Sequence, residues 1–139
     1  MQIPYKIAAL GLTASLLASP ASAHHSLAMF DLVHCKTVTG TVHTLEWNYP
    51  HSWLWIQTPN PQPAAAPVWF GFEFMSPSQA RAIDPRWSKD VVKKGDIVTV
   101  TFGPLRDGRN GGAVSSVRIP DGHVLGGTPG ICGTAQRTH

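Results

Sequence analysis

The chain has 139 residues, among them 11 lysines and arginines and 8 aspartates and glutamates, which give a formal net charge of +3. This length allows one compact domain rather than two. The weak positive charge and the absence of a basic run argue against a nucleic-acid partner or an anionic lipid surface.

The first predicted element is a cleavable secretory signal over residues 1–23. Lys6 supplies a positive charge, residues 7–18 form an uncharged apolar run, and Ala21-Ser22-Ala23 presents the small residues that signal peptidase recognises. This run is too short to span a bilayer comfortably, and no later segment is long enough. We therefore expect cleavage after Ala23, no membrane span afterwards, and a periplasmic or secreted mature protein. Cleavage after Ala21 is the alternative.

The next residues, 24–35, are expected to form an N-terminal arm, and residues 36–125 a β-rich domain. Residues 36–47 are strand-like, but the apolar positions change phase after Gly40, which predicts a bend or bulge. Residues 52–57 form a second strand that is apolar on both faces. The following segment, 58–67, carries four prolines and is expected to be an extended loop.

Beyond this loop, residues 68–74 alternate strictly and predict a third strand. Ser76, Pro77 and Gln79 have the spacing of a capping box, so we expect a short helix there that ends at Asp84. Residues 97–102 and 113–119 predict two more strands, and Asn110-Gly111-Gly112 lies in the predicted hairpin connection between them. The Gly- and Thr-rich residues 126–139 are expected to form a loose tail apart from Cys132.

Five strands with a short helix between the third and the fourth predict an all-β domain. Their order is that of a small five-stranded OB-like barrel. A small Greek-key β-sandwich is the alternative fold.

The two cysteines, Cys35 and Cys132, lie near opposite ends of this domain. In an oxidising compartment such a pair is most simply interpreted as a disulfide. The competing interpretation is that Cys35 binds a metal together with the adjacent His34.

The expected cleavage would place His24 at the new N-terminus. A free α-amino group and the imidazole of the same histidine can chelate Cu(II) in a plane, and a second imidazole completes a T-shaped histidine brace. The predicted metal ligands are His24, with His51 as the third nitrogen donor and His25 as an alternative. An N-terminus that has no metal-binding role is the competing interpretation, because such sites also need fixed surrounding groups.

A polar and aromatic cluster surrounds the turn before the second strand. It predicts a ligand-binding rim in which flat rings supply contact area and polar side chains supply hydrogen bonds. The predicted ligand-binding residues are Glu46, Trp47, Asn48 and Trp53, with Trp55, Trp69 and His51 as further candidates. The serine and carboxylate residues show no hydrolase pattern, so the sequence favours a binding protein over an enzyme.

Several of these segments together resemble a family of small exported bacterial proteins of unknown function. The resemblance rests on the His-His-Ser start at 24–26, Met29-Phe30-Asp31, Glu46-Trp47, Pro50-His51-Ser52-Trp53, Ser76-Pro77, Trp87, the Lys-Lys-Gly-Asp-Ile-Val-Thr-Val segment at 93–100, Asp107-Gly108 and Ile119-Pro120-Asp121-Gly122. It implies export and a small β-rich domain, and it links the two histidine-bearing segments. Tyr49 stands where the family places Asn, and the cysteine pair is not part of the family pattern.

These observations predict an exported small β-barrel protein that binds a metal, with copper as the expected cofactor. The alternative is a metal-free periplasmic module that binds a small ligand or a partner protein. A third hypothesis, a brace-type copper oxidase that acts on polysaccharide, needs a flat binding face for which so short a chain leaves little room.

Overall fold

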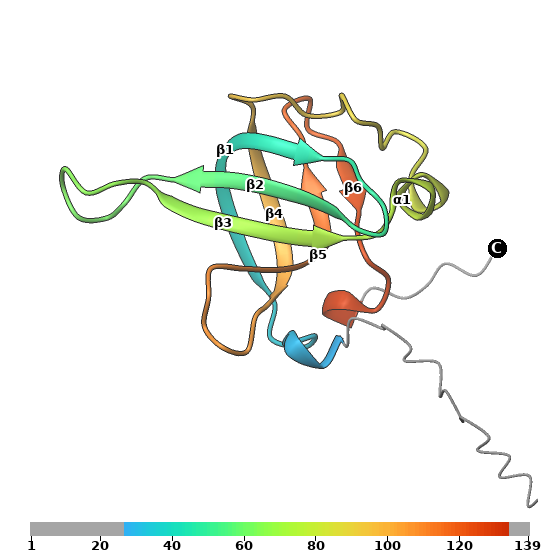
Figure 1. Cartoon of the computed structure of the whole chain (residues 1–139), viewed down its shortest axis with the longest axis horizontal. Helices are drawn as coiled ribbons and strands as arrows, with labels where there is room; N and C mark the ends of the chain where they lie inside the picture. The colour runs from blue at the N-terminus through green and yellow to red at the C-terminus, as the bar shows by residue number, and fades with distance from the viewer. Residues whose placement is uncertain (1–26, 134–139) are drawn as a thin grey trace, which may run out of the picture.

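The computed structural model describes residues 27–133, which form nine short elements (Figure 1). In chain order these are η1 (Leu27–Met29), β1 (Lys36–Glu46), β2 (Ser52–Thr58), β3 (Val68–Phe74), α1 (Pro77–Ile83), β4 (Ile97–Pro104), β5 (Gly111–Arg118), β6 (Val124–Gly126) and η2 (Ile131–Gly133). The predicted helix has the expected capping box, in which Ser76 accepts from the Gln79 amide. No helix within residues 27–133 has the length and apolar character needed to cross a membrane.

The strands form one sheet in the order β3-β2-β1-β4-β5-β6, and a parallel pairing of β3 with β5 closes it. The closed circuit is therefore β1-β2-β3-β5-β4, with α1 between β3 and β4. This confirms the prediction of a small all-β barrel of the OB type, and not the alternative sandwich. The short β6 adds to β5 outside the circuit.

The bend predicted in the first strand is a register shift between Val42 and Thr44. Residues 36–41 pair with β4 and residues 41–46 pair with β2, so the shift lies within the part of β1 that pairs with β2. A bulge of this kind lets one strand serve both sides of a barrel. It also explains the phase change of the apolar residues, because the inward-facing parity switches at the bulge.

Closure of the barrel depends on glycines that we expected in a turn. Gly111 and Gly112 belong to β5 itself, and the hairpin turn lies before them. A Cβ at Gly111 would collide with the Gly71 carbonyl oxygen, and a Cβ at Gly112 would collide with the Gly103 carbonyl oxygen. Three strands approach each other here, so the backbone has no room for side chains.

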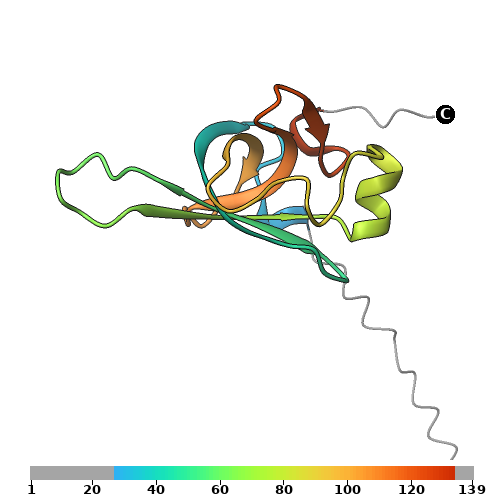
Figure 2. The same ribbon diagram turned by 90° about the horizontal axis from the view of Figure 1, so that it is seen from above.

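The main core fills the barrel and includes Trp87. The helix α1 lies at one end of the barrel (Figure 1). A second, smaller cluster joins Phe30, Ala113 and Ile131 near the disulfide. On the side opposite to α1, the β2–β3 hairpin projects beyond the barrel and carries the proline-rich loop at its tip, as Figure 2 shows.

The expectation of a loose tail is wrong for residues 126–133. The amides of Gly127 and Thr128 donate to the carbonyls of Ser115 and Val114, each at 2.8 Å. Ile131 is completely buried. The Gly- and Thr-rich composition suggested a loose segment. However, Gly127 lets the backbone lie close to β5, and the buried side chain of Ile131 anchors the segment.

The predicted disulfide between Cys35 and Cys132 is present, with the two Cα atoms 5.6 Å apart. It joins the residue before β1 to η2. The segment before β1 is also held by hydrogen bonds, since the Asp31 amide donates to the Pro104 carbonyl oxygen at 2.8 Å. The backbone amides of His34 and Val33 donate to the Asp31 carboxylate and lower its pKa to about 2. The start of the described chain is thus fixed against the barrel.

Candidate metal and ligand site

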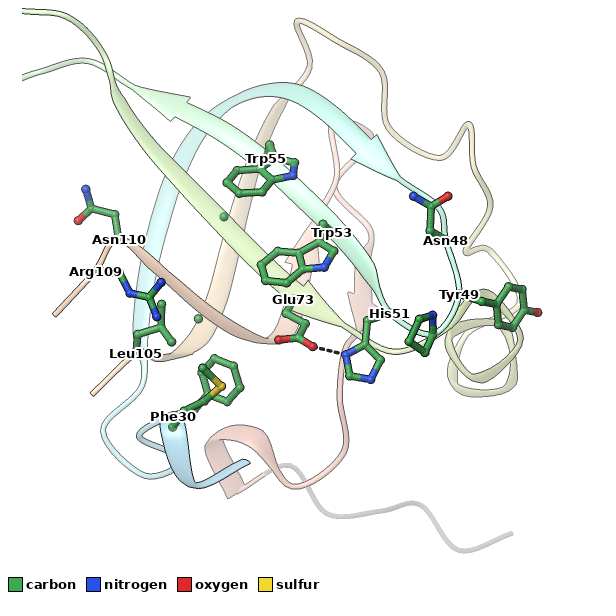
Figure 3. A pocket seen from close by; sticks show the side chains of 14 residues that line it. Phe30, Asn48, Tyr49, His51, Trp53, Trp55, Glu73, Leu105, Arg109 and Asn110 are labelled. Carbon is green, nitrogen blue, oxygen red and sulfur yellow. Dashed lines mark hydrogen bonds and ion pairs between the residues drawn. The ribbon is translucent and has the colours of Figure 1, made fainter. Parts of the chain in front are cut away.

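Two hollows adjoin on the surface of the barrel, and His51 and Glu73 line both of them. The larger has a volume of about 690 Å³ and the smaller about 330 Å³. Figure 3 shows the larger one, with residues from β2, β3 and the β4–β5 hairpin around it. The volume of the larger hollow is in the range typical of small-molecule sites.

The β2–β3 register explains how His51 and Glu73 meet. Trp53 lies directly opposite Glu73 in the antiparallel pair. His51 precedes Trp53 by two residues, so it lies on the same face of the sheet and diagonal to Glu73. A turn with a cis Tyr49–Pro50 peptide bond leads into this position.

The His51 ring and the Glu73 carboxylate form a direct contact, with Nδ1 facing Oε1 (Figure 3). The side chain of His51 is 34% exposed and that of Glu73 is 12% exposed. Because a carboxylate accepts hydrogen bonds, this contact places the proton on Nδ1 and makes Nε2 the nitrogen that carries a lone pair in the neutral ring. Histidines that bind metals are oriented in this way by a carboxylate.

The other predicted metal ligands, His24 and His25, lie outside the described residues. Leu27, the first residue described, lines the smaller hollow together with His51 and Glu73. His24 is three residues before it. A chain of that length spans at most roughly 10 Å. Within residues 27–133, no three His, Cys, Asp or Glu side chains group in a way that could hold a metal ion.

The predicted ligand-binding residues divide into two pairs. Asn48 and Trp53 line the larger hollow. Glu46 and Trp47 do not line either hollow: Glu46 is exposed at the end of β1, and the Trp47 ring stacks on Trp87 with centroids 6.1 Å apart. Trp47 thus belongs to the end of the core near α1, and the Arg81 guanidinium lies over its outer face.

The remaining tryptophans of the cluster also separate. Trp55 lines the larger hollow beside Trp53, with ring centroids 5.7 Å apart and planes inclined by 16°. Trp69 is outside it, on the projecting part of β3, where its ring contacts the edge of His43. The alternation of side chains along β2 is the signal that groups Trp53 with Trp55.

Sequence reasoning missed most of the residues that face Trp53 across the larger hollow. These are Phe30 from the N-terminal segment and Leu105, Arg109 and Asn110 from the β4–β5 hairpin. It also missed the role of Glu73, because it tested the carboxylates only for a hydrolase pattern. Only the strand register, once known, brings Glu73 to His51.

Two charged side chains lie at the edges of the larger hollow, and each is paired. Glu73 contacts His51, and the Arg109 guanidinium donates to Asp107 at 2.7 Å. The hydrogen bonds from the Arg109 amide and side chain lower the pKa of Asp107. The charge of Arg109 is thus paired with that of Asp107, and the Glu73 carboxylate is hydrogen-bonded to the His51 ring.

Comparison with known protein families gave a match over most of the chain. The family described as "Family of unknown function (DUF6152)" matches residues 13–115, which is well over half of the chain and includes both histidine-bearing segments. Neither the curated proteins nor the solved structures compared with the chain gave a match.

Proposed function

Because the chain belongs to this family of unknown function, whose description assigns no activity, we propose a function from its own residues: it is an exported protein that binds Cu(II). The proposed ligands are the α-amine and ring of His24 and the ring of His51, with His25 as the alternative third ligand. The contact between His51 and Glu73 is the observation that carries this proposal.

The carboxylate does two things for a metal-binding imidazole. By accepting a hydrogen bond from Nδ1, it fixes the tautomer in which Nε2 can bind a cation, and it holds the orientation of the ring. Glu73 is itself held in β3, opposite Trp53, so the pair is oriented by the barrel. A ligand fixed before binding loses less conformational entropy than one on a mobile loop.

The donor set favours copper among the divalent metals of the first transition series. An amine and two imidazoles are nitrogen donors, and copper(II) binds such sites more tightly than the other divalent ions and prefers tetragonal geometry. The barrel supplies one of these donors, and the cleaved N-terminus would supply two. Leu27 lines the hollow that also contains His51, and the chain from His24 to Leu27 spans at most roughly 10 Å, which supports the proposal that His24 and His51 share one site.

Export is part of the proposal, since the brace requires a free amine at His24. The disulfide supports it, because structural disulfides persist in oxidising compartments. The signal-like residues 1–23 supply the other support. The proposed location is the periplasm or the exterior of the cell.

Competition titration of the metal-free protein with a chromophoric chelator tests the proposal. We expect protein that begins at His24 to bind one Cu(II). A form with three additional alanines before His24 should bind it at least tenfold more weakly, since the amine is then displaced from the ring and neither His24 nor His25 stands at the third position, where it could chelate Cu(II) through the backbone amides. Glu73→Gln should weaken binding by about 10–100-fold, as loss of an orienting carboxylate does elsewhere.

The matched control is His123→Gln, which removes an exposed histidine that contacts Asp121 in the β5–β6 turn. Its affinity should equal that of the unmodified protein. Equal affinities for the native and alanine-extended forms would rule out the brace, and an unaltered affinity of His51→Gln would rule out the barrel ligand.

A further inference from the structure

The larger hollow has a feature that the copper proposal does not use, namely a wall of two indoles. Trp53 and Trp55 alternate along β2 and project from the same face of the sheet (Figure 3). Their rings are nearly parallel, with an angle of 16° between the planes. They form a continuous aromatic wall over the β2–β3 pair.

The strand beside this wall makes room for it. Gly71 of β3 pairs with Trp55, and a Cβ at Gly71 would collide with the benzo ring of that indole. The bare glycine thus lets the Trp55 ring lie over β3. Phe30 and Leu105 line the hollow on the side away from Trp55, so a flat ligand would contact apolar groups on more than one side.

The electrostatics of the hollow disfavour an anionic ligand. Both charged side chains at its edges already have partners, Glu73 with His51 and Arg109 with Asp107. An anion such as a phosphodiester chain needs cations that are not already neutralised by carboxylates. The remaining polar side chains at the rim include the amides of Asn48 and Asn110, each of which can both donate and accept hydrogen bonds.

We propose that this hollow binds a neutral oligosaccharide, with a sugar ring packed against Trp53 and Trp55. A pyranose ring has an apolar face of C–H groups that packs on an indole, and a rim of hydroxyls that suits amide side chains. A pocket that is mainly apolar with few polar groups fits such a ligand. The site lies on the β2–β3 face with the adjacent loops, the surface by which OB-type barrels bind oligonucleotides and oligosaccharides.

The test is a titration of the metal-free protein with cellotetraose, chitotetraose and maltotetraose, followed by tryptophan fluorescence and calorimetry. We expect at least one of these neutral sugars to bind at millimolar concentration or below. Tetragalacturonate and a ten-nucleotide oligothymidylate, the anionic probes, should bind more weakly. Failure of all three neutral sugars, or tighter binding of either anion, would overturn the proposal.

Variants locate the binding. Trp53→Ala and Trp55→Ala should each weaken it about tenfold or more, because each loses one stacking surface. Trp69→Ala removes an exposed indole outside the hollow and should have no effect. Asn110→Ala changes an exposed hairpin residue that the core does not need, so it gives a second measure if a tryptophan variant unfolds, and it should also weaken binding. Equal losses for Trp69→Ala and Trp53→Ala would contradict the assignment.

This inference does not depend on copper. Sugar binding should be the same for protein that begins at His24 and for the form with three additional alanines, although the second form is expected to lose the brace. Loss of copper affinity with retained sugar binding would therefore contradict neither proposal. Loss of sugar binding in the alanine-extended form would contradict the independence of the two sites.

Discussion

Replacement of Trp87 with alanine is expected to lower the free energy of unfolding by about 3–5 kcal/mol, the typical range for removal of a buried tryptophan. Trp87 is 1% exposed. Its ring packs on Phe74 with centroids 5.0 Å apart and on Trp47. Its indole N–H donates to the Gly126 carbonyl at 2.8 Å.

The size of this effect follows from the place of the residue. Trp87 lies between α1 and β4, and it covers one end of the barrel while bonding to the last strand. Its loss leaves a cavity and a carbonyl without its donor, and both changes destabilise the folded state. Trp87→Phe loses the hydrogen bond but keeps part of the ring packing, so a smaller loss is expected.

Urea unfolding followed by far-UV circular dichroism measures both variants. Trp69→Ala is the matched control, since that indole is 44% exposed on the projecting hairpin. It should shift the unfolding free energy by less than about 1 kcal/mol. A Trp87→Ala protein as stable as the Trp69→Ala protein would contradict the packing described for this end of the barrel.

The second large effect is expected from the disulfide. A protein with both Cys35→Ser and Cys132→Ser should lose about 2–5 kcal/mol of stability. The bridge joins residues separated by 97 positions, so it removes a large amount of conformational freedom from the unfolded chain. Native contacts of Phe30 and Ile131 near the bridge should keep the fold intact when it is absent.

Guanidinium unfolding with and without dithiothreitol separates this effect from other consequences of the substitutions. The reductant should lower the midpoint of the unmodified protein and leave that of the double variant unchanged. If the two proteins unfold at the same midpoint in the absence of reductant, the bridge does not contribute to stability in the way we describe.

Much of the fold could be predicted because local patterns agreed with the global order. The alternation at 68–74 and the capping box at Ser76 and Gln79 place a strand and a helix directly. With the phase change near Gly40, these signals are sufficient to predict an OB-like order. The pairing of β3 with β5 at Gly111 and Gly112, which closes the barrel, could not be predicted. In the sequence, glycines that lie in a strand cannot be distinguished from glycines that form a turn.

The candidate site was less predictable, because its residues come from four separate segments. Asn48, His51 and Trp53 are close in sequence, and the pattern found them. Glu73, Arg109 and Phe30 reach the same place only through the strand register and the packing of the N-terminal segment. Trp47 was assigned to the rim because the sequence does not indicate which end of the barrel α1 covers.

The central claim is that cleavage at Ala23 and the barrel residue His51 together create one copper site. Intact mass spectrometry of the exported protein under native conditions, with and without added Cu(II), tests it most directly. We predict a chain that begins at His24, with a mass lowered by two hydrogens for the disulfide and raised by one copper ion when copper is present. A chain that begins at another residue, or one that begins at His24 and retains no copper, would contradict the account.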